Sequence, residues 1–304
     1  MHDLAQRIEL NVSRVLLGKS QAIELAITTL FAGGHLLIED KPGVGKTVLA
    51  RALARSLDLP FQRLQCTADL LPSDVVGAQI YEPGSGKITF RPGPVFTSVL
   101  VVDELNRMPP RTQSALLECM QEHRVSVDRT THELPDPFFV VATQNPMLFQ
   151  GTYPLPENQL DRFLLRIKLG YPDATTEVEI LQKAEGHKAV ADLRPVANPE
   201  ELRDVRAKVE AVRVEPDLAA YIVGLANATR TARDVRLPVS TRGAQALHRA
   251  ARARALVQGR DYVVPEDIRS LVVPALAHRI AVRGGDGAAE AMLLELSSTV
   301  TIPE

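Results

Sequence analysis

Short apolar runs alternate with amphipathic stretches from the N-terminus to about Leu169. Short apolar runs bounded by turn formers predict strands, whereas apolar residues at helical spacing predict helices. The predicted strands are Leu36–Glu39, Phe61–Gln65, Val99–Asp103, Phe138–Thr143 and Leu164–Leu169. The predicted helices are Gln21–Ala32, Lys46–Leu57, Arg111–Gln121 and Gln159–Arg162. This alternation favours an α/β fold, in which helices cover both faces of a parallel sheet.

The pattern changes after Tyr171-Pro172-Asp173, where strand signals almost cease. The predicted helices of this half are Thr175–Glu185, Pro199–Val212, Pro216–Ala232, Thr241–Gln258 and Pro265–Leu276. Three of them begin with proline, which suits the first helical turn. A chain of 304 residues is near the size at which one core stops growing. We therefore expect an α/β core over residues 1–170 and a linker with an all-helical domain over residues 171–304.

Two segments depart from plain alternation. In about residues 77–94, Pro83-Gly84-Ser85-Gly86 separates two short strand-like runs. In about residues 124–135, Asp128-Arg129-Thr130 does the same. Both patterns predict hairpins inserted into the core. They are either plain exposed loops or surfaces that contact a substrate.

Composition narrows the class of protein. Hydrophobic residues make up 45% of the chain, enough for a buried core, and the formal net charge of -2 gives no electrostatic case for a nucleic-acid binder. Two cysteines do not form a disulfide framework and favour a cytoplasmic chain. The N-terminus lacks the layout of a signal peptide, and the longest uncharged stretch, Leu25–Ile38, is too short to span a membrane.

The clearest chemical signal is a glycine-rich run between a predicted strand and a predicted helix, Pro42-Gly43-Val44-Gly45-Lys46-Thr47-Val48. Glycines let successive backbone N–H groups curl around phosphates, and the following helix directs its positive end at them. Lys46 can reach the β- and γ-phosphates, and Thr47 can place its hydroxyl on Mg²⁺. Asp40 stands where the generic pattern has glycine, and Asp also tolerates unusual turn conformations. The run predicts a site for a nucleoside triphosphate.

The predicted strand Val99–Asp103 ends in two carboxylates that suit hydrolysis. Asp103 would hold Mg²⁺, directly or through water, and Glu104 would orient and activate the attacking water. An ordinary solvated turn is common for Asp-Glu alone, but not downstream of a glycine-rich phosphate loop.

Two further polar residues follow or precede predicted strands. Asn145 could hold the attacking water or contact the γ-phosphate, although a turn-forming Asn before Pro146 is equally plausible. Arg162 lies beside the last predicted strand and could reach into a neighbouring subunit's site, although single arginines are more often solvated or paired.

Together these features resemble the AAA+ ATPases and, more narrowly, the MoxR family. The resemblance covers nearly the whole chain, and four stretches carry it most clearly: Leu71-Pro72-Ser73-Asp74; Phe90-Arg91-Pro92-Gly93-Pro94-Val95-Phe96; Asp103-Glu104-Leu105-Asn106-Arg107 through Thr112-Gln113-Ser114-Ala115-Leu116-Leu117-Glu118; and Ala142-Thr143-Gln144-Asn145-Pro146 through Gly151-Thr152-Tyr153-Pro154-Leu155-Pro156-Glu157.

The resemblance implies a role for each candidate residue. Lys46 and Thr47 would belong to the Walker A motif, Asp103 and Glu104 to Walker B, and Asn145 would be sensor 1. Asp40 looks ordinary for the family.

In the same way, Arg162 matches the arginine finger supplied to the adjacent subunit. Arg242 matches sensor 2 in the lid, although the family more often has Pro where Thr241 stands. The first hairpin matches the helix-2 insert and the second the hairpin before sensor 1. The stretch from Val15 to Lys19 would lie near the adenine, with Lys19 where Gln is more usual.

The resemblance implies a cytoplasmic, Mg²⁺-dependent ATPase that forms a ring, expected to be a homo-hexamer. Its members act on protein clients in a chaperone-like way, often with proteins that contain von Willebrand factor A domains. Whether Arg242 would act on its own subunit's ATP or a neighbour's stays open at this point.

Three other functions remain open. The first is the motor subunit of a metal chelatase, which shares the helix-2 insert. The second is a nucleic-acid motor, which would use the basic residues in or beside the hairpins: Lys87, Arg91, Arg124 and Arg129. Near-neutral charge and 4% aromatic residues argue against it. The third is a non-hydrolysing nucleotide switch, against which Glu104 and Asn145 argue.

Overall fold

The computed structural model describes residues 2–84, 86–128, 130–145, 152–183, 190–285 and 287–302. Its centre is a five-stranded parallel sheet with the strand order β2–β5–β8–β1–β9. β5 is buried along its whole length, as an uninterrupted apolar run predicts for a strand covered on both faces. The predicted α/β class is therefore confirmed. The strands of this sheet are β1 (Leu36–Glu39), β2 (Phe61–Gln65), β5 (Val99–Asp103), β8 (Phe139–Gln144) and β9 (Leu165–Ile167).

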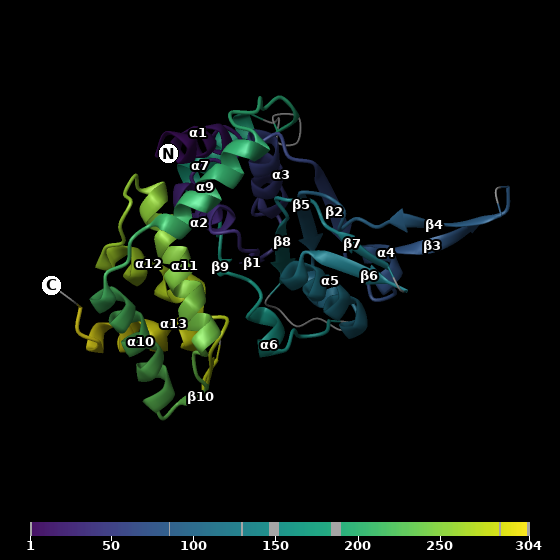
Figure 1. The fold of residues 1–304 in the computed structure, drawn as a ribbon. Helices are drawn as coiled ribbons and strands as arrows, with labels where there is room; N and C mark the ends of the chain where they lie inside the picture. The colour runs from purple at the N-terminus through teal and green to yellow at the C-terminus, as the bar shows by residue number, and fades with distance from the viewer. Residues whose placement is uncertain are drawn as a thin grey trace.

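Helices cover both faces of the sheet (Figure 1). Leu36 and Ile38 of β1 belong to an apolar cluster with α1, α2 and α3, whereas Leu37 belongs to a second cluster with α4 and α5. This division follows because successive side chains of a strand point to opposite faces. The elements around the sheet are α1 (His2–Ser13), α2 (Ser20–Phe31), α3 (Lys46–Ser56), α4 (Pro72–Val76), η1 (Leu105–Arg107), α5 (Pro110–Glu122) and α6 (Glu157–Leu160).

The two segments with hairpin patterns are antiparallel ladders. The first joins β3 (Gly77–Glu82) to β4 (Lys87–Pro92), and the second joins β6 (Arg124–Val127) to β7 (Thr130–Glu133). The Phe90 ring stacks on the His132 ring with centroids 3.9 Å apart, so the two hairpins pack against each other. The β3–β4 hairpin extends away from the body at the end opposite the helical half (Figure 1).

The C-terminal half is helical, which confirms the predicted helical lid. It also contains a short antiparallel pair that the pattern did not predict, β10 (Val235–Leu237) with β11 (Ala281–Val282). Helices α1, α4 and α13 and the short helix η1 were likewise not predicted. The predicted elements agree with the observed ones to within two residues at each end, apart from the predicted end of Thr175–Glu185, which lies outside the described residues. The helices of this half are α7 (Ala174–Lys183), α9 (Pro199–Ala211), α10 (Pro216–Thr231), α11 (Thr241–Val257), α12 (Pro265–Leu276) and α13 (Ala288–Thr299).

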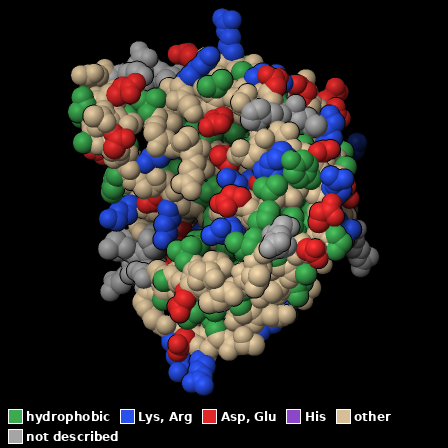
Figure 2. Space-filling view, turned by 90° about the vertical axis from the view of Figure 1, so that its left-hand side faces the viewer, with side chains coloured by type: hydrophobic (Ala, Val, Ile, Leu, Met, Phe, Trp, Pro, Cys, Tyr) green, Lys and Arg blue, Asp and Glu red, His purple; other side chains and the backbone are tan. Residues whose placement is uncertain are grey.

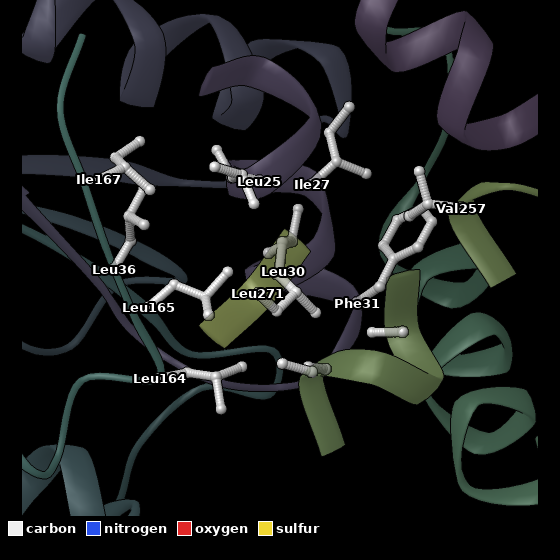
Figure 3. Packing of buried hydrophobic residues seen from close by; sticks show 14 of the residues in the cluster. Leu25, Ile27, Leu30, Phe31, Leu36, Leu164, Leu165, Ile167, Val257 and Leu271 are labelled. Carbon is white, nitrogen blue, oxygen red and sulfur yellow. The ribbon is translucent and has the colours of Figure 1, made fainter. Parts of the chain in front are cut away.

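The lid shares one apolar core with the sheet domain. Helix α2 provides the junction, because its Leu30 and Phe31 are fully buried and lie in the same cluster as Val257 of α11 and Leu271 of α12 (Figure 3). Leu165 of β9 belongs to this cluster as well. The lid is thus held to its own subunit by continuous hydrophobic packing.

The surface on the lid side carries charges of both signs. Lys and Arg side chains are interspersed there with Asp and Glu (Figure 2), so this face has no extended field of one sign. Among the described residues, no helix combines the length and the apolar character needed to cross a membrane.

Candidate functional site

A cavity of about 320 Å³ lies at the carboxyl ends of β1, β5 and β8. This is the position at which open parallel sheets bind their ligands. The structure brings together here nearly all the residues predicted for phosphate and Mg²⁺ binding. The lining residues are Pro42, Gly43, Gly45, Lys46, Thr47, Val48, Arg63, Gln65, Asp103, Glu104, Thr143 and Asn145.

The loop from β1 into α3 forms one wall of this cavity. Gly43 and Gly45 have φ angles of +84° and +98°, which favour glycine. A Cβ on Gly45 would also lie 2.8 Å from Leu16 Cδ1, so the Leu16 side chain would have to shift. Gly45 caps the N-terminus of α3 and directs the positive end of that helix into the cavity. Val44, in contrast, is buried in the apolar core.

Lys46 lies directly after Gly45 and is held toward the loop. Its Nζ donates a hydrogen bond to the backbone oxygen of Asp40 at 2.6 Å. Burial lowers the pKa of Lys46, and the carboxylates of Asp40, Asp103 and Glu104 partly offset this. A cation with nearby carboxylates and a helix N-terminus is suited to the β- and γ-phosphates of a nucleotide.

Thr47 and Asp103 provide the oxygen atoms that Mg²⁺ prefers. The Thr47 hydroxyl donates to Asp103 Oδ2 at 3.4 Å, and the Thr143 hydroxyl donates to Asp103 Oδ1 at 3.3 Å. Thr47 and Asp103 are therefore the residues that would hold Mg²⁺, which would neutralise charge on bound phosphates. Asp103 also pairs with Arg63, whose Nε lies 2.6 Å from Oδ2.

Glu104 has a backbone conformation that is unusual for a residue with a side chain. Its φ and ψ are 59° and 52°, in the left-handed region. Its N–H donates to the Thr143 hydroxyl at 2.9 Å, which helps to hold this turn. The Glu104 carboxylate accepts from Arg107 at 2.9 Å and from Gln65 at 3.4 Å. Strained turns of this kind cluster at functional sites.

Four residues of this arrangement were not predicted: Arg63, Gln65, Arg107 and Thr143. Alternation along β2 shows that Arg63 and Gln65 share a face. Only the pairing of β2 with β5, which places Gln65 beside Asp103, shows that this face borders the cavity. Thr143 could have been found from its position at the end of a buried strand, two residues before Asn145.

The structure does not bring Arg162 and Arg242 to the phosphate loop. Both line a second cavity of about 290 Å³, which also includes Arg249 and Arg279 and shares no lining residue with the first. The Nε atom of Arg162 is shielded from solvent and makes no hydrogen bond to any described residue. The second cavity is rich in arginine, although one of these arginines, Arg279, is already paired with Asp161.

Arg242 lies in the first turn of α11. Thr241 is the first residue of this helix, and the Ser240 hydroxyl accepts a hydrogen bond from the Gly243 N–H at 3.0 Å. A serine cap therefore starts the helix, and Thr241 occupies the position at which the resemblance leads us to expect proline. Five positions quoted from the sequence lie outside the described residues: Ser85, Arg129, Pro146, Gly151 and Glu185.

Comparisons with known proteins agree with this architecture. Residues 35–165 match the ATPase family associated with various cellular activities (AAA), and residues 227–295 match the AAA lid domain. The chain is 35% identical to Chaperone MoxR1 of Mycobacterium tuberculosis, over 100% of this chain and 83% of that protein. It is 44% identical to the uncharacterized protein YeaC of Bacillus subtilis, over 100% and 96%. A crystal structure of a Cytophaga hutchinsonii protein superposes with a TM-score of 0.90 at 36% identity, over 100% of this chain and 96% of that one.

Proposed function

This chain belongs to the MoxR family of AAA+ ATPases, and from that premise we propose that it hydrolyses ATP to ADP and phosphate with Mg²⁺. The energy would serve to remodel, mature or activate partner proteins. The observation that carries the proposal is the grouping of Lys46, Thr47, Asp103, Glu104 and Asn145 around one cavity at the carboxyl end of the sheet. We place the nucleotide-binding core in residues 1–170, with its two hairpins, and the linker and lid in residues 171–304.

In this proposal each residue has one task. The loop amides and Lys46 hold the phosphates, while Thr47 and Asp103 hold Mg²⁺, which would neutralise charge on the phosphates. Glu104 orients and activates the attacking water, and Asn145 contacts the γ-phosphate. Arg107 and Gln65, both within hydrogen-bond reach of Glu104, keep that carboxylate at the cavity.

We further propose that Arg162 and Arg242 both act on the ATP of a neighbouring subunit in a ring, which we expect to be a hexamer. Support comes from their position, because both line the second cavity and neither lines the nucleotide cavity of its own chain. An arginine supplied by a neighbour contributes on the order of 10³–10⁵ in rate. An isolated subunit should therefore be almost inactive.

We propose that the chain acts in the cytoplasm and that its client is a protein, the latter in line with the name of the relative Chaperone MoxR1. A protein with a von Willebrand factor A domain is the partner that we would test first. The β3–β4 hairpin is a suitable contact surface, because Tyr81 and Ile88 face each other across its strands and are both exposed.

The test is ATP turnover per subunit over a wide range of protein concentration, with Mg²⁺. We expect the specific rate to rise steeply with concentration in the wild type and to stay low in Arg162→Ala. Arg283→Ala, which removes an exposed lid arginine, is the matched control and should behave as wild type. Glu104→Gln should bind ATP and assemble, but turn over about 10²–10⁴ times more slowly.

Two results would overturn parts of this proposal. A rate that is independent of concentration and unchanged in Arg162→Ala, with monomers throughout by sizing, would remove the ring and the shared site. Rapid turnover by Glu104→Gln would remove Glu104 from its assigned role.

A further inference from the structure

Strand β9 connects the arginine finger segment to the linker that leads into the lid. Arg162 lies three residues before β9, and Leu169 and Gly170 follow it. β9 runs parallel to β1, with Leu36 opposite Leu165 and Ile38 opposite Ile167. Because the two strands are in register, the end of β9 lies beside the first residues of the phosphate loop.

Asp40 joins the phosphate loop to the end of β9. Its Oδ2 accepts hydrogen bonds from the backbone N–H groups of Leu169 at 2.8 Å and Gly170 at 2.6 Å. Its Oδ1 accepts from the N–H of Lys41 at 2.8 Å. Hydrogen bonds to a carboxylate are roughly twice as strong as neutral ones. The glycine of the generic loop could make none of these side-chain contacts.

Three neighbouring contacts strengthen this junction. The Lys41 ammonium lies 5.8 Å from the centre of the Tyr171 ring. Arg166 of β9 donates to Glu39 at 2.8 Å and to Glu290 of α13 at 2.7 Å, which ties the end of β1 to the lid. The side chains of Arg166, Glu39 and Glu290 are 15%, 16% and 21% exposed, so solvent screens these two ion pairs less than pairs at the surface.

The other end of β9 is held by Arg279 of the lid, which is only 5% exposed. Its Nε pairs with Asp161 Oδ1 at 2.6 Å, and its other nitrogens donate to the backbone oxygens of Phe163 at 2.6 Å and Leu164 at 3.1 Å. Burial lowers the pKa of Arg279, and Asp161 offsets this. The residues on both sides of Arg162 are therefore fixed to the same subunit's lid.

We propose that Asp40 is a positioning residue that couples a subunit's own phosphate loop to β9, and through β9 to the arginine finger serving the next subunit. From Phe163 to Gly170 the chain covers roughly 23 Å at about 3.3 Å per residue. The segment is attached at both ends, by Asp40 and by Arg279, so a shift of the loop is transmitted rather than absorbed. This inference rests on the proposed function, since the finger acts only within an ATP-hydrolysing ring.

Hydrogen exchange of the full-length protein tests the junction directly. Without nucleotide, Asp40→Ala should raise the exchange rates of the Leu169 and Gly170 amides by on the order of ten- to a hundredfold. This factor corresponds to the free energy of one lost hydrogen bond to a charged group. Asp40→Asn should fall between wild type and Asp40→Ala, because its amide oxygen is an uncharged and weaker acceptor for the Leu169 and Gly170 amides, and its NH₂ group would face the Lys41 N–H. Asp204→Asn, which removes an exposed carboxylate of α9, is the matched control. Unchanged exchange at both amides in Asp40→Ala would overturn the inference.

Adding a non-hydrolysable ATP analogue tests the coupling. In the wild type we expect lower exchange across residues 163–170, although none of them lines the nucleotide cavity. In Asp40→Asn the analogue should still bind, within about twofold, because the loop amides and Lys46 remain, but protection of residues 163–170 should be lost. Protection that persists in the variant would refute the coupling alone. Failure of wild type to bind the analogue would refute the proposed function, and the coupling with it.

Kinetics separate positioning from a general loss of structure. Asp40→Asn should lower kcat by about tenfold and leave ADP affinity nearly unchanged. In an Arg162→Ala background the same substitution should have little further effect, because interacting residues are not additive. Independent, multiplying effects of the two substitutions would show that Asp40 does not act through the finger.

Discussion

At the scale of single residues, the Asp103 carboxylate would bind two cations, the Arg63 guanidinium and the proposed Mg²⁺. Its Oδ2 accepts from Arg63, and the same oxygen lies beside the Thr47 hydroxyl proposed to bind Mg²⁺. The Arg63 side chain is 54% exposed, so the pair contributes at most about 1 kcal/mol. Arg63 would therefore compete with Mg²⁺ at the proposed metal site without blocking it.

This balance predicts the effect of removing the arginine. Arg63→Gln should lower the Mg²⁺ concentration needed for half-maximal ATP turnover by about fivefold, because the competing cation is lost. Titration of turnover and of fluorescent ADP binding with Mg²⁺ would measure it, with Arg91→Gln in the β3–β4 hairpin as the control. A higher Mg²⁺ requirement would indicate that Arg63 helps to bind the nucleotide instead.

A second residue-scale prediction concerns His35, which directly precedes β1 and is buried. Its Nε2 donates to the backbone oxygen of Met120, and its Nδ1 accepts from the Val140 N–H. A ring with one donating and one accepting nitrogen is neutral. Burial lowers the pKa of His35 from 6.5 to about 3. Between these values the unfolded state binds a proton that the folded state excludes, so the free energy of unfolding falls as pH falls from 6.5 toward 3.

The expected contribution of His35 is about 2 kcal/mol lost between pH 7 and pH 5. His35→Gln keeps a donor and an acceptor but does not titrate, so its stability should fall less over the same interval. Urea unfolding of both proteins at the two pH values measures the difference. Identical pH dependence in the two proteins would contradict this account.

At the scale of elements, the start of α11 shows how a local substitution can be accommodated. Ser240 caps the helix through the Gly243 N–H, and Thr241 occupies the first helical position. Proline is well tolerated at that position because its missing N–H would have no partner within the helix. The serine cap and the proline are therefore compatible ways to begin the helix that carries Arg242.

We accordingly predict different effects on stability for substitutions at two adjacent positions. Ser240→Ala should destabilise the protein by about 1 kcal/mol through loss of the cap. Thr241→Pro should be neutral or slightly stabilising, since it restricts the unfolded chain. Thermal and urea unfolding would measure both, and a large loss of stability in Thr241→Pro would show that the first turn is less regular than the structure has it.

At the scale of the whole molecule, the two halves share a single apolar core. Leu30 of α2 and Leu271 of α12 are both fully buried in the cluster that joins the sheet to the lid. A lid packed in this way can shift only by small sliding of its helices over α2, which is a shear movement. A movement of this size is compatible with the attachment of residues 163–170 to the lid at one end and to the phosphate loop at the other.

The shared core predicts cooperative unfolding. We expect one thermal transition for the whole chain, and Leu271→Ala should destabilise it by about 2–5 kcal/mol without splitting it in two. Calorimetry combined with hydrogen exchange in the core and in the lid would test this. Separate transitions for the two halves would mean that the junction at α2 contributes little.

The nucleotide cavity and the α/β class could be predicted from the sequence because their signals are local. Strand and helix periodicity, the glycines at positions 43 and 45, and carboxylates at the end of an apolar run each depend on a few adjacent residues. Parallel strands then bring their carboxyl ends to one edge, which places Lys46, Asp103 and Asn145 together.

Only the tertiary structure decided where the other residues of the two cavities lie, because their positions depend on strand register and on packing between distant segments. The pairing of β2 with β5 turned Arg63 and Gln65 toward the cavity. The packing of α11 and α12 on α2 and β9 placed Arg242 in the same cavity as Arg162, away from the nucleotide cavity of the same chain. In the sequence, Asp40 only marked the absence of the usual glycine. The register of β1 with β9 made it the acceptor for the Leu169 and Gly170 amides.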